Sequence, residues 1–286
     1  MSQKPTAKLA LGTVQFGLDY GISNLTGRTP KSEVARILKL AELNNINTLD
    51  TAKGYGESEA ILGELGVEDF HVISKLTPSE LKNNTAETLV KQSLKALRLS
   101  KLYSMLFHNA ESAMQYPGAV QELQAQKVTG IISKWGYSVY NPEELEQLLN
   151  KYELPDLIQV PYNHLDNRFE PLLKELHANG VEIHTRSTFL QGVFFMNPEQ
   201  LSKFFNPLKD YLVALQEGFG SSESMASALL FWVLEKPFID KVVIGVNTKR
   251  QLESNIRNLG TSSAILLPKP FNVPNELLMP NLWPKN

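Results

Sequence analysis

Residues 47–63, NTLDTAKGYGESEAILG, contain a complete change from strand to helix. The run at 47–52 has the apolar and β-branched content of a short buried strand, and the acidic stretch from Ser58 onward has a helical pattern. Between them, glycines flank Tyr55 and favour a turn. The stretch therefore predicts a strand, a loop and a helix, with Asp50 at the end of the strand and Tyr55 in the loop.

The same alternation of strand and helix repeats along nearly the whole chain. Apolar residues recur at helical spacing between strand-like runs, and no G-x-G-x-x-G motif opens a helix after the first strand, as a Rossmann fold would require. Eight such units predict a single α/β domain, a (β/α)8 TIM barrel. The predicted strands are 8–14, 47–52, 70–76, 102–108, 130–138, 157–163, 181–187 and 241–246, and predicted helices include 32–45, 86–99, 142–152 and 169–180.

The connection between the seventh and eighth strands is too long for one helix. We expect residues 188–205 to form an extended loop over the barrel mouth, followed by extra helices at about 206–218 and 222–235. The barrel core then spans about 8–260, and the tail 261–286, rich in proline and asparagine, is expected to be irregular. We assign the whole chain, 1–286, to one domain.

The amino-acid composition and charge indicate what class of partner the chain binds. The chain has 286 residues, 42% of them hydrophobic and 20% charged, and no apolar run is long enough to span a bilayer. Its N-terminus lacks the pattern of a secretory signal, which favours the cytoplasm. There are no cysteines, and the net charge is −2 with scattered basic residues, so disulfides and nucleic-acid binding are not expected. The expected partner is a small molecule, and the oligomeric state stays open.

Three residues at consecutive strand ends and Tyr55 in a neighbouring loop can form one reactive group. Active sites of this barrel lie at the carboxyl ends of its strands, where Asp50, Lys75 and His108 are placed. The Asp50 carboxylate can pair with the Lys75 ammonium, and that ammonium can lower the pKa of the Tyr55 phenol. A phenol with a lowered pKa can protonate an oxygen that gains negative charge. Hydride delivery to an aldehyde or ketone creates such an oxygen.

In the frame DTAxxYGxSExxLG … SK … H, these residues resemble the catalytic tetrad of the aldo-keto reductase family, NAD(P)H-dependent barrel enzymes. The resemblance covers roughly residues 8–260 and implies that Tyr55 is the general acid/base. It implies further that Lys75 lowers the Tyr55 pKa with Asp50 as its counter-ion, and that His108 orients the carbonyl. Other residues of the first motif fall at the family's spacing, namely Ser58, Glu59, Leu62 and Gly63.

The resemblance also implies a nicotinamide cofactor site made from the later strands. Ser138 and Gln159 would contact the carboxamide, and Arg186 occupies a position where the family usually has an aromatic residue stacked on the nicotinamide. A guanidinium can also stack on a flat ring. The segment VIGVNTKRQLESN resembles the family's binding segment for the adenosine phosphates. The implied cofactor-binding residues are Ser138, Gln159, Arg186, Ser187, Gln191, Gly245, Asn247, Thr248, Gln251 and Asn255.

Asn247 departs from NADP-preferring relatives, which often have a basic residue or serine there. Lys249 and Arg250 can supply the charge for a 2′-phosphate, so we expect NADPH, with NADH as the alternative. His164 and His184 lack a matching carboxylate spacing, so no metal site is expected.

The loop 17–30, with Asp19, Tyr20 and Asn24, is the expected determinant of substrate selection. The opening LGTVQFGLDYG resembles bacterial relatives associated with carbohydrate metabolism, which suggests a sugar-derived carbonyl. Two other functions stay open. One is a nucleotide-binding regulatory barrel with negligible turnover, and the other is an aldolase or isomerase that forms a Schiff base on Lys75.

Overall fold

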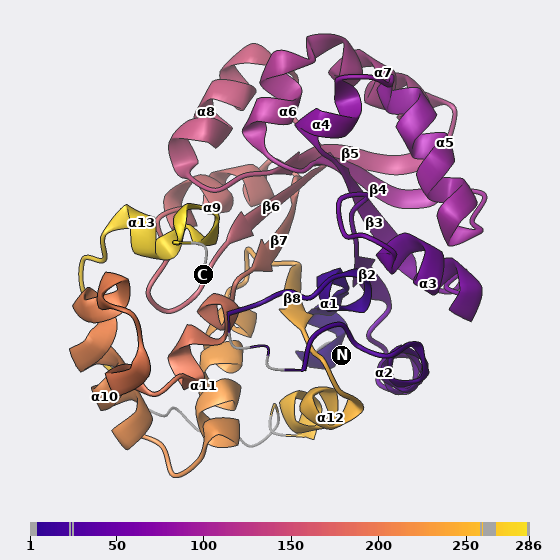
Figure 1. Cartoon of the computed structure of the whole chain (residues 1–286). Coiled ribbons are helices and arrows are strands. Elements are labelled where there is room, and N and C mark those ends of the chain that lie inside the picture. The colour runs from indigo at the N-terminus through magenta and orange to yellow at the C-terminus, as the bar shows by residue number, and fades with distance from the viewer. Residues whose placement is uncertain (1–4, 23, 25, 258, 260–266, 285–286) are drawn as a thin grey trace.

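The computed structural model describes residues 5–22, 24, 26–257, 259 and 267–284. At its centre, eight parallel strands form a closed barrel in chain order, in which the first strand pairs with the last (Figure 1). The predicted (β/α)8 barrel is therefore confirmed, with strands shorter than their sequence patterns. They are β1 (Leu9–Gly12), β2 (Thr48–Asp50), β3 (His71–Leu76), β4 (Leu102–Phe107), β5 (Ile132–Ser138), β6 (Leu157–Pro161), β7 (Glu182–Arg186) and β8 (Lys241–Gly245).

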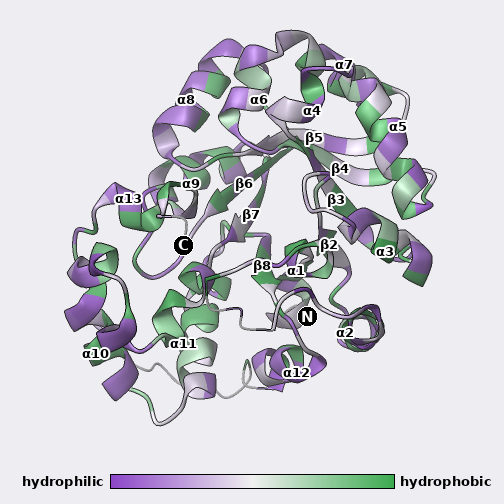
Figure 2. Cartoon of the chain, in the orientation of Figure 1, coloured by the Kyte–Doolittle hydropathy of each residue, from purple (hydrophilic) through white to green (hydrophobic). Residues whose placement is uncertain are grey.

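Helices surround the barrel and cover its apolar outer surface (Figure 2). No helix among the described residues is long and apolar enough to cross a membrane. The α-helices are α1 (Val14–Gly17), α2 (Lys31–Leu43), α3 (Ser58–Leu65), α4 (Pro78–Leu81), α5 (Ala86–Leu97), α6 (Ala110–Gln115), α7 (Pro117–Val128), α8 (Pro142–Lys151), α9 (Glu170–Ala178), α10 (Lys209–Glu217), α11 (Ser222–Leu234), α12 (Lys249–Arg257) and α13 (Asn275–Leu278). The 3-10 helices are η1 (Pro5–Lys8), η2 (Leu190–Phe195), η3 (Pro198–Gln200), η4 (Lys203–Leu208) and η6 (Pro280–Leu282).

Helix α5 shows how the sequence forms this outer layer. The Thr85 hydroxyl accepts a hydrogen bond from the Thr88 backbone N–H and caps the first turn, a contact that contributes about 1 kcal/mol. Leu89, Val90 and Leu97 then recur at helical spacing and are all buried. The helix is thus fixed by its cap at one end and by one apolar face along its length.

The segment after β7 forms a second apolar cluster beside the barrel, which confirms the extended loop and the extra helices. The helix expected at 206–218 begins only at Lys209, because Pro207 interrupts the hydrogen-bond pattern and the chain before it is the 3-10 helix η4. The tail is less irregular than expected, since it contains α13 and η6. Trp283 packs edge-on against Phe205 in this cluster, and apolar burial therefore orders the tail.

A polar cluster near the amino ends of the strands centres on Glu182, the first residue of β7. Its carboxylate accepts a hydrogen bond from the Tyr103 hydroxyl at 2.6 Å, lies 2.5 Å from Nε2 of His184 and pairs with Lys134. Burial alone would raise the pKa of Glu182, but His184, Lys134 and Tyr103 together lower it to about 2. The ionised carboxylate therefore stabilises the folded chain.

We expect Glu182→Gln to lower the free energy of unfolding at pH 7 by about 1–3 kcal/mol. The folded-state pKa lies below the ordinary value of 4.5, so this contribution is present above that value and is lost as the pH falls towards 2. Urea denaturation at pH 7 and pH 3 measures the loss, with Glu199→Gln as a control because Glu199 makes an exposed ion pair. An equal difference between variant and wild type at both pH values would contradict the assignment.

Candidate active site

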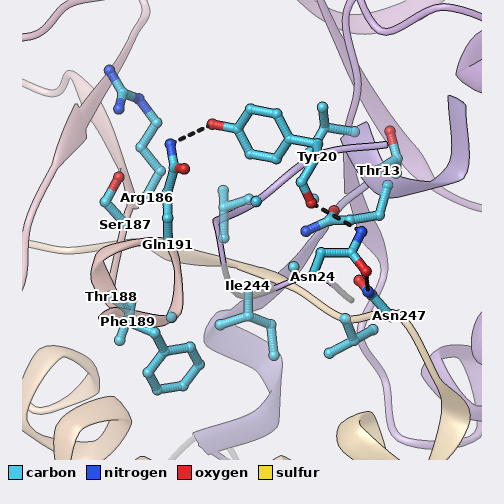
Figure 3. A pocket seen from close by; sticks show the side chains of 18 of the residues that line it. Thr13, Tyr20, Asn24, Arg186, Ser187, Thr188, Phe189, Gln191, Ile244 and Asn247 are labelled. Carbon is cyan, nitrogen blue, oxygen red and sulfur yellow. Dashed lines mark hydrogen bonds between the residues drawn. The ribbon is translucent and has the colours of Figure 1, made fainter. Parts of the chain in front are cut away.

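A cavity of about 870 Å³ opens at the carboxyl ends of the strands, with a volume suited to a small molecule. Residues from the ends of β1, β2, β5, β7 and β8 line it, together with the loops that follow them. Figure 3 shows residues from the β7 extension on one side and residues from the loop after β1 on the other. This is the end of the barrel where the sequence predicted the site.

Asp50 and Lys75 form a buried ion pair beneath the cavity. The Lys75 ammonium donates to both Asp50 carboxylate oxygens at 2.7 Å and to the Thr51 carbonyl at 3.1 Å, and its side chain is 1% exposed. Gln159 donates to the same carboxylate at 2.6 Å. Burial lowers the pKa of Lys75, and the Asp50 charge opposes that change. The structure thus brings together the ion pair that the sequence predicted.

Tyr55 lies over this pair, with its ring centroid 5.2 Å from the Lys75 nitrogen. Burial raises the pKa of Tyr55, the Asp50 charge adds to the rise and Arg186 opposes it. The expected lowering of this pKa by Lys75 is therefore not found, because burial of the phenol and the nearby Asp50 charge both raise it. The phenol is protonated at neutral pH and carries a proton that it can donate.

His108 directly follows β4 and its ring meets the Tyr55 ring edge-on, with 5.6 Å between centroids. Burial lowers the pKa of His108 to about 3, and the charges of Lys75 and Arg186 act in the same direction. The imidazole is therefore neutral at physiological pH. A neutral imidazole can donate a hydrogen bond to a carbonyl oxygen without transferring a proton to it.

Close backbone contacts position the Tyr55 loop. A Cβ atom on Gly17 would lie 1.8 Å from the Tyr55 carbonyl oxygen, so α1 can approach the loop only with glycine there. Gly56 has a φ of +59° and a Cβ on it would lie 2.7 Å from the Gly17 carbonyl oxygen. The buried Ser58 hydroxyl donates to the Thr13 carbonyl at 3.0 Å and ties the loop to the chain after β1. Gly17 did not emerge from the sequence because its partner lies far along the chain.

The residues implied as cofactor ligands all line the cavity. Three buried oxygens on its wall have no hydrogen-bond partner among the described residues: Gln15 Oε1, Gln159 Oε1 and Thr188 Oγ1. Buried polar atoms are normally paired, so unpaired atoms that face a cavity indicate that a polar ligand belongs there. Gln15 and Thr188 were not identified from the sequence as candidate ligands, although Gln15 lies in the opening LGTVQFGLDYG.

Strained backbone conformations also occur in the segment after β7, part of which lines the cavity. Ser187, Leu190 and Gln191 have φ values of 64°, 46° and 50°, and Ser187 and Gln191 line the cavity. Such conformations cost free energy in residues other than glycine and are often found at binding sites. They follow directly after β7, where the sequence placed part of the cofactor site.

Side chains occupy the N–H groups at the start of α12, where we expected an anion. The Gln251 Oε1 accepts from the backbone N–H groups of Asn247 at 2.7 Å and Thr248 at 3.2 Å. The N–H of Lys249 donates to Glu33 at 2.7 Å, and the Lys249 ammonium pairs with Glu253. The Gln251 oxygen therefore stands where a phosphate oxygen would bind, and this side chain must move for an anion to enter.

The loop 17–30 contacts both edges of the cavity through side chains (Figure 3). Gln191 donates to the Tyr20 hydroxyl at 2.7 Å, and the Asn247 amide donates to Asn24 at 2.7 Å. Asp19, which we grouped with Tyr20 and Asn24, is exposed and not part of the lining. The contact between Asn24 and Asn247 places this part of the loop beside the segment expected to bind the adenosine phosphates.

Arg186 stacks on a protein ring in this structure. Its guanidinium lies 4.2 Å from the centroid of Tyr140 and donates to the Val139 carbonyl at 3.1 Å. Tyr140 lines the cavity and was missed in the sequence, although it lies only two residues beyond Ser138, the end of β5. The aromatic partner of Arg186 therefore comes from the chain itself.

Comparisons with known proteins agree with this fold. A family model described as the aldo/keto reductase family matches residues 8–262. An aldo-keto reductase of Pseudocercospora fijiensis (strain CIRAD86) is 23% identical, over 74% of this chain and 86% of that protein.

Solved structures share the fold at low identity. The holo form of an aldo-keto reductase from Bacillus halodurans is 18% identical, with a TM-score of 0.70 over 89% of this chain and 87% of the other. A glycerol dehydrogenase from Gluconobacter oxydans is 21% identical, with a TM-score of 0.69 over 90% of this chain and 88% of the other.

Proposed function

The chain belongs to the aldo/keto reductase family of oxidoreductases, and on that premise we propose that it reduces an aldehyde or ketone to an alcohol by hydride transfer from NADPH. The observation that supports this most is the buried pair of Asp50 and Lys75 placed beneath Tyr55 at the barrel mouth. A buried ion pair gives little net stability, so its position under a phenol points to a role in the reaction.

In this proposal Tyr55 donates its proton to the carbonyl oxygen as negative charge develops there. The neutral His108 donates a hydrogen bond to the same oxygen and fixes its direction. The Lys75 ammonium, 5.2 Å from the phenol ring, favours the tyrosinate that remains after proton transfer. Tyr55 is thus protonated in the resting protein, and the Lys75 ammonium stabilises the negative charge on its oxygen only as the proton leaves.

The nicotinamide cofactor supplies the hydride when it is bound. We propose that Ser138 and Gln159, which pair on neighbouring strands, hold its carboxamide, and the unpaired Gln159 Oε1 is a suitable acceptor for the amide N–H. Ser187, Gln191, Gly245 and Asn255 line the cavity further along the proposed cofactor path. The hydrogen-bond donors and acceptors that line the cavity therefore fit a dinucleotide.

Arg250 is the proposed ligand of the 2′-phosphate, because it lines the cavity whereas Lys249 pairs with Glu253. We expect Arg250→Ala to raise the dissociation constant of NADPH by roughly 10-fold or more and to leave that of NADH nearly unchanged, since a charge-assisted contact is lost. Fluorescence titration with both nucleotides measures this. Lys249→Ala serves as the matched control, and equal weakening of both nucleotides in Arg250→Ala would refute the assignment.

A sugar-derived carbonyl is our proposed substrate, and a panel of aldehydes and ketones tests the activity. Loss of NADPH absorbance that depends on both protein and carbonyl is the expected result. Trapping of substrate on Lys75 by borohydride without nucleotide would favour the Schiff-base alternative, which needs Lys75 as a free amine. Tight nucleotide binding with no turnover on any carbonyl would favour the regulatory alternative.

A further inference from the structure

Arg186 places a positive charge in the wall of the cavity. It ends β7, lines the cavity and is partly buried. Over the part of the chain that the structure describes, no carboxylate lies within ion-pair distance of its guanidinium. A guanidinium has five N–H donors, and the contact with Val139 uses one of them. The remaining donors can bind an anion from outside the chain.

The acidic residues of the cavity are not placed to supply that anion. Among the described lining residues, Asp50 and Glu223 carry carboxylates. Asp50 is committed to Lys75 and Gln159. Glu223 lies in the first turn of α11, a helix that packs against α12 and so lies towards the proposed adenosine end. The Arg186 charge is therefore not compensated by either residue.

The Arg186 charge acts close to the reacting groups. It contributes to the lowered pKa of His108, after burial and Lys75, and it opposes the rise in the pKa of Tyr55. Tyr20 and Tyr140 line the same cavity, and the Tyr20 hydroxyl can donate a hydrogen bond. Since the Tyr20 oxygen accepts from Gln191, its own proton can go to another acceptor.

We propose that Arg186 binds an oxyanion group of the substrate, so that the preferred substrates are aldehydes or ketones that carry a carboxylate or a phosphate. The planar fork of the guanidinium matches two oxygens of either group, and its stacking on Tyr140 holds the fork in one orientation. The inference rests on the proposed reduction and adds the substrate class. It assigns Arg186 to the substrate, in place of the nicotinamide ring that the family resemblance implied.

Matched substrate pairs test the proposal. Succinic semialdehyde against butanal probes a carboxylate, and glyceraldehyde 3-phosphate against glyceraldehyde probes a phosphate. We expect kcat/KM for the charged member of at least one pair to exceed that of the neutral member by roughly 10-fold or more. Arg186→Gln should abolish this preference, because KM for the charged member should rise far more than KM for the neutral member. The pair with the larger preference identifies the anion.

Two variants separate substrate binding from other roles of Arg186. Arg250→Gln, at the other cation of the cavity, should retain the preference for charged substrates, and Arg186→Lys should restore part of it. Equal loss of rate on charged and neutral substrates in Arg186→Gln, or weaker NADPH binding, would overturn the proposal and return Arg186 to the cofactor. Equal rates on both members of each pair in the wild type would refute the anion preference alone. No reduction of any substrate would refute the proposed reduction itself.

Discussion

Tyr55→Phe is expected to lower kcat for carbonyl reduction by roughly 10²–10⁴-fold, because it removes the proposed proton donor and leaves the ring in place. Burial already keeps the phenol protonated at neutral pH, so no other change of charge accompanies the substitution. Affinity for NADPH should change little, since the proposed cofactor contacts lie on other strands. Steady-state rates with a reducible aldehyde and fluorescence titration with NADPH measure the two quantities.

Tyr20→Phe is the matched control, because it also removes a phenol oxygen from the cavity wall. This variant loses the hydrogen bond from Gln191 but not the proposed acid. We expect kcat of Tyr20→Phe to fall far less than kcat of Tyr55→Phe, and any effect on binding to appear in KM, because the loop that carries Tyr20 is the expected determinant of substrate selection. If Tyr55→Phe retained wild-type turnover, or if both variants lost activity equally, Tyr55 could not be the specific proton donor.

Lys75→Met is expected to lower both stability and activity. Removing one partner of the buried pair leaves the Asp50 carboxylate uncompensated, which costs about 3–5 kcal/mol of folding free energy. The variant also removes the cation that favours the tyrosinate. We therefore expect a lower unfolding midpoint together with a fall in kcat of roughly 10²-fold or more.

A second variant separates the two effects of Lys75. In the double variant Asp50→Asn with Lys75→Met, no buried charge is left unpaired, so most of the lost stability should return. Activity should remain low because the cation is still absent. Thermal unfolding and kcat measured on the wild type and both variants decide this. Recovery of both stability and activity in the double variant would show that the ion pair has a purely structural role.

The barrel and the proximity of Asp50, Lys75, Tyr55 and His108 were predictable from the sequence for a simple physical reason. The strand patterns are local, and a lysine at the end of a buried strand needs a counter-charge, which Asp50 supplies from the neighbouring strand. Because carboxyl ends of parallel strands meet at one edge, consecutive strand ends predict a common site. The order of the strands and the polar residues at their carboxyl ends can both be read from the sequence pattern.

Other features depend on contacts that no local pattern records. The rise in the Tyr55 pKa could not be predicted, because it depends first on burial of the phenol and then on the Asp50 charge. The hydrogen bond of Asn24 with Asn247 joins side chains from opposite ends of the chain. Gln251 reaches the N–H groups at the start of α12 only in one side-chain rotamer. The stacking of Arg186 on Tyr140 depends on the distance between the ends of two strands.

Transfer of a labelled hydride tests the central claim most directly. Wild-type protein is incubated with NADPH deuterated at the transferable position of the nicotinamide C4 and with succinic semialdehyde, and the product alcohol is analysed by mass spectrometry. The proposed function predicts one deuterium on the carbinol carbon for each NADPH oxidised, and almost no product with Tyr55→Phe. Oxidised NADPH without deuterium in the alcohol, or alcohol formed without NADPH, would contradict it.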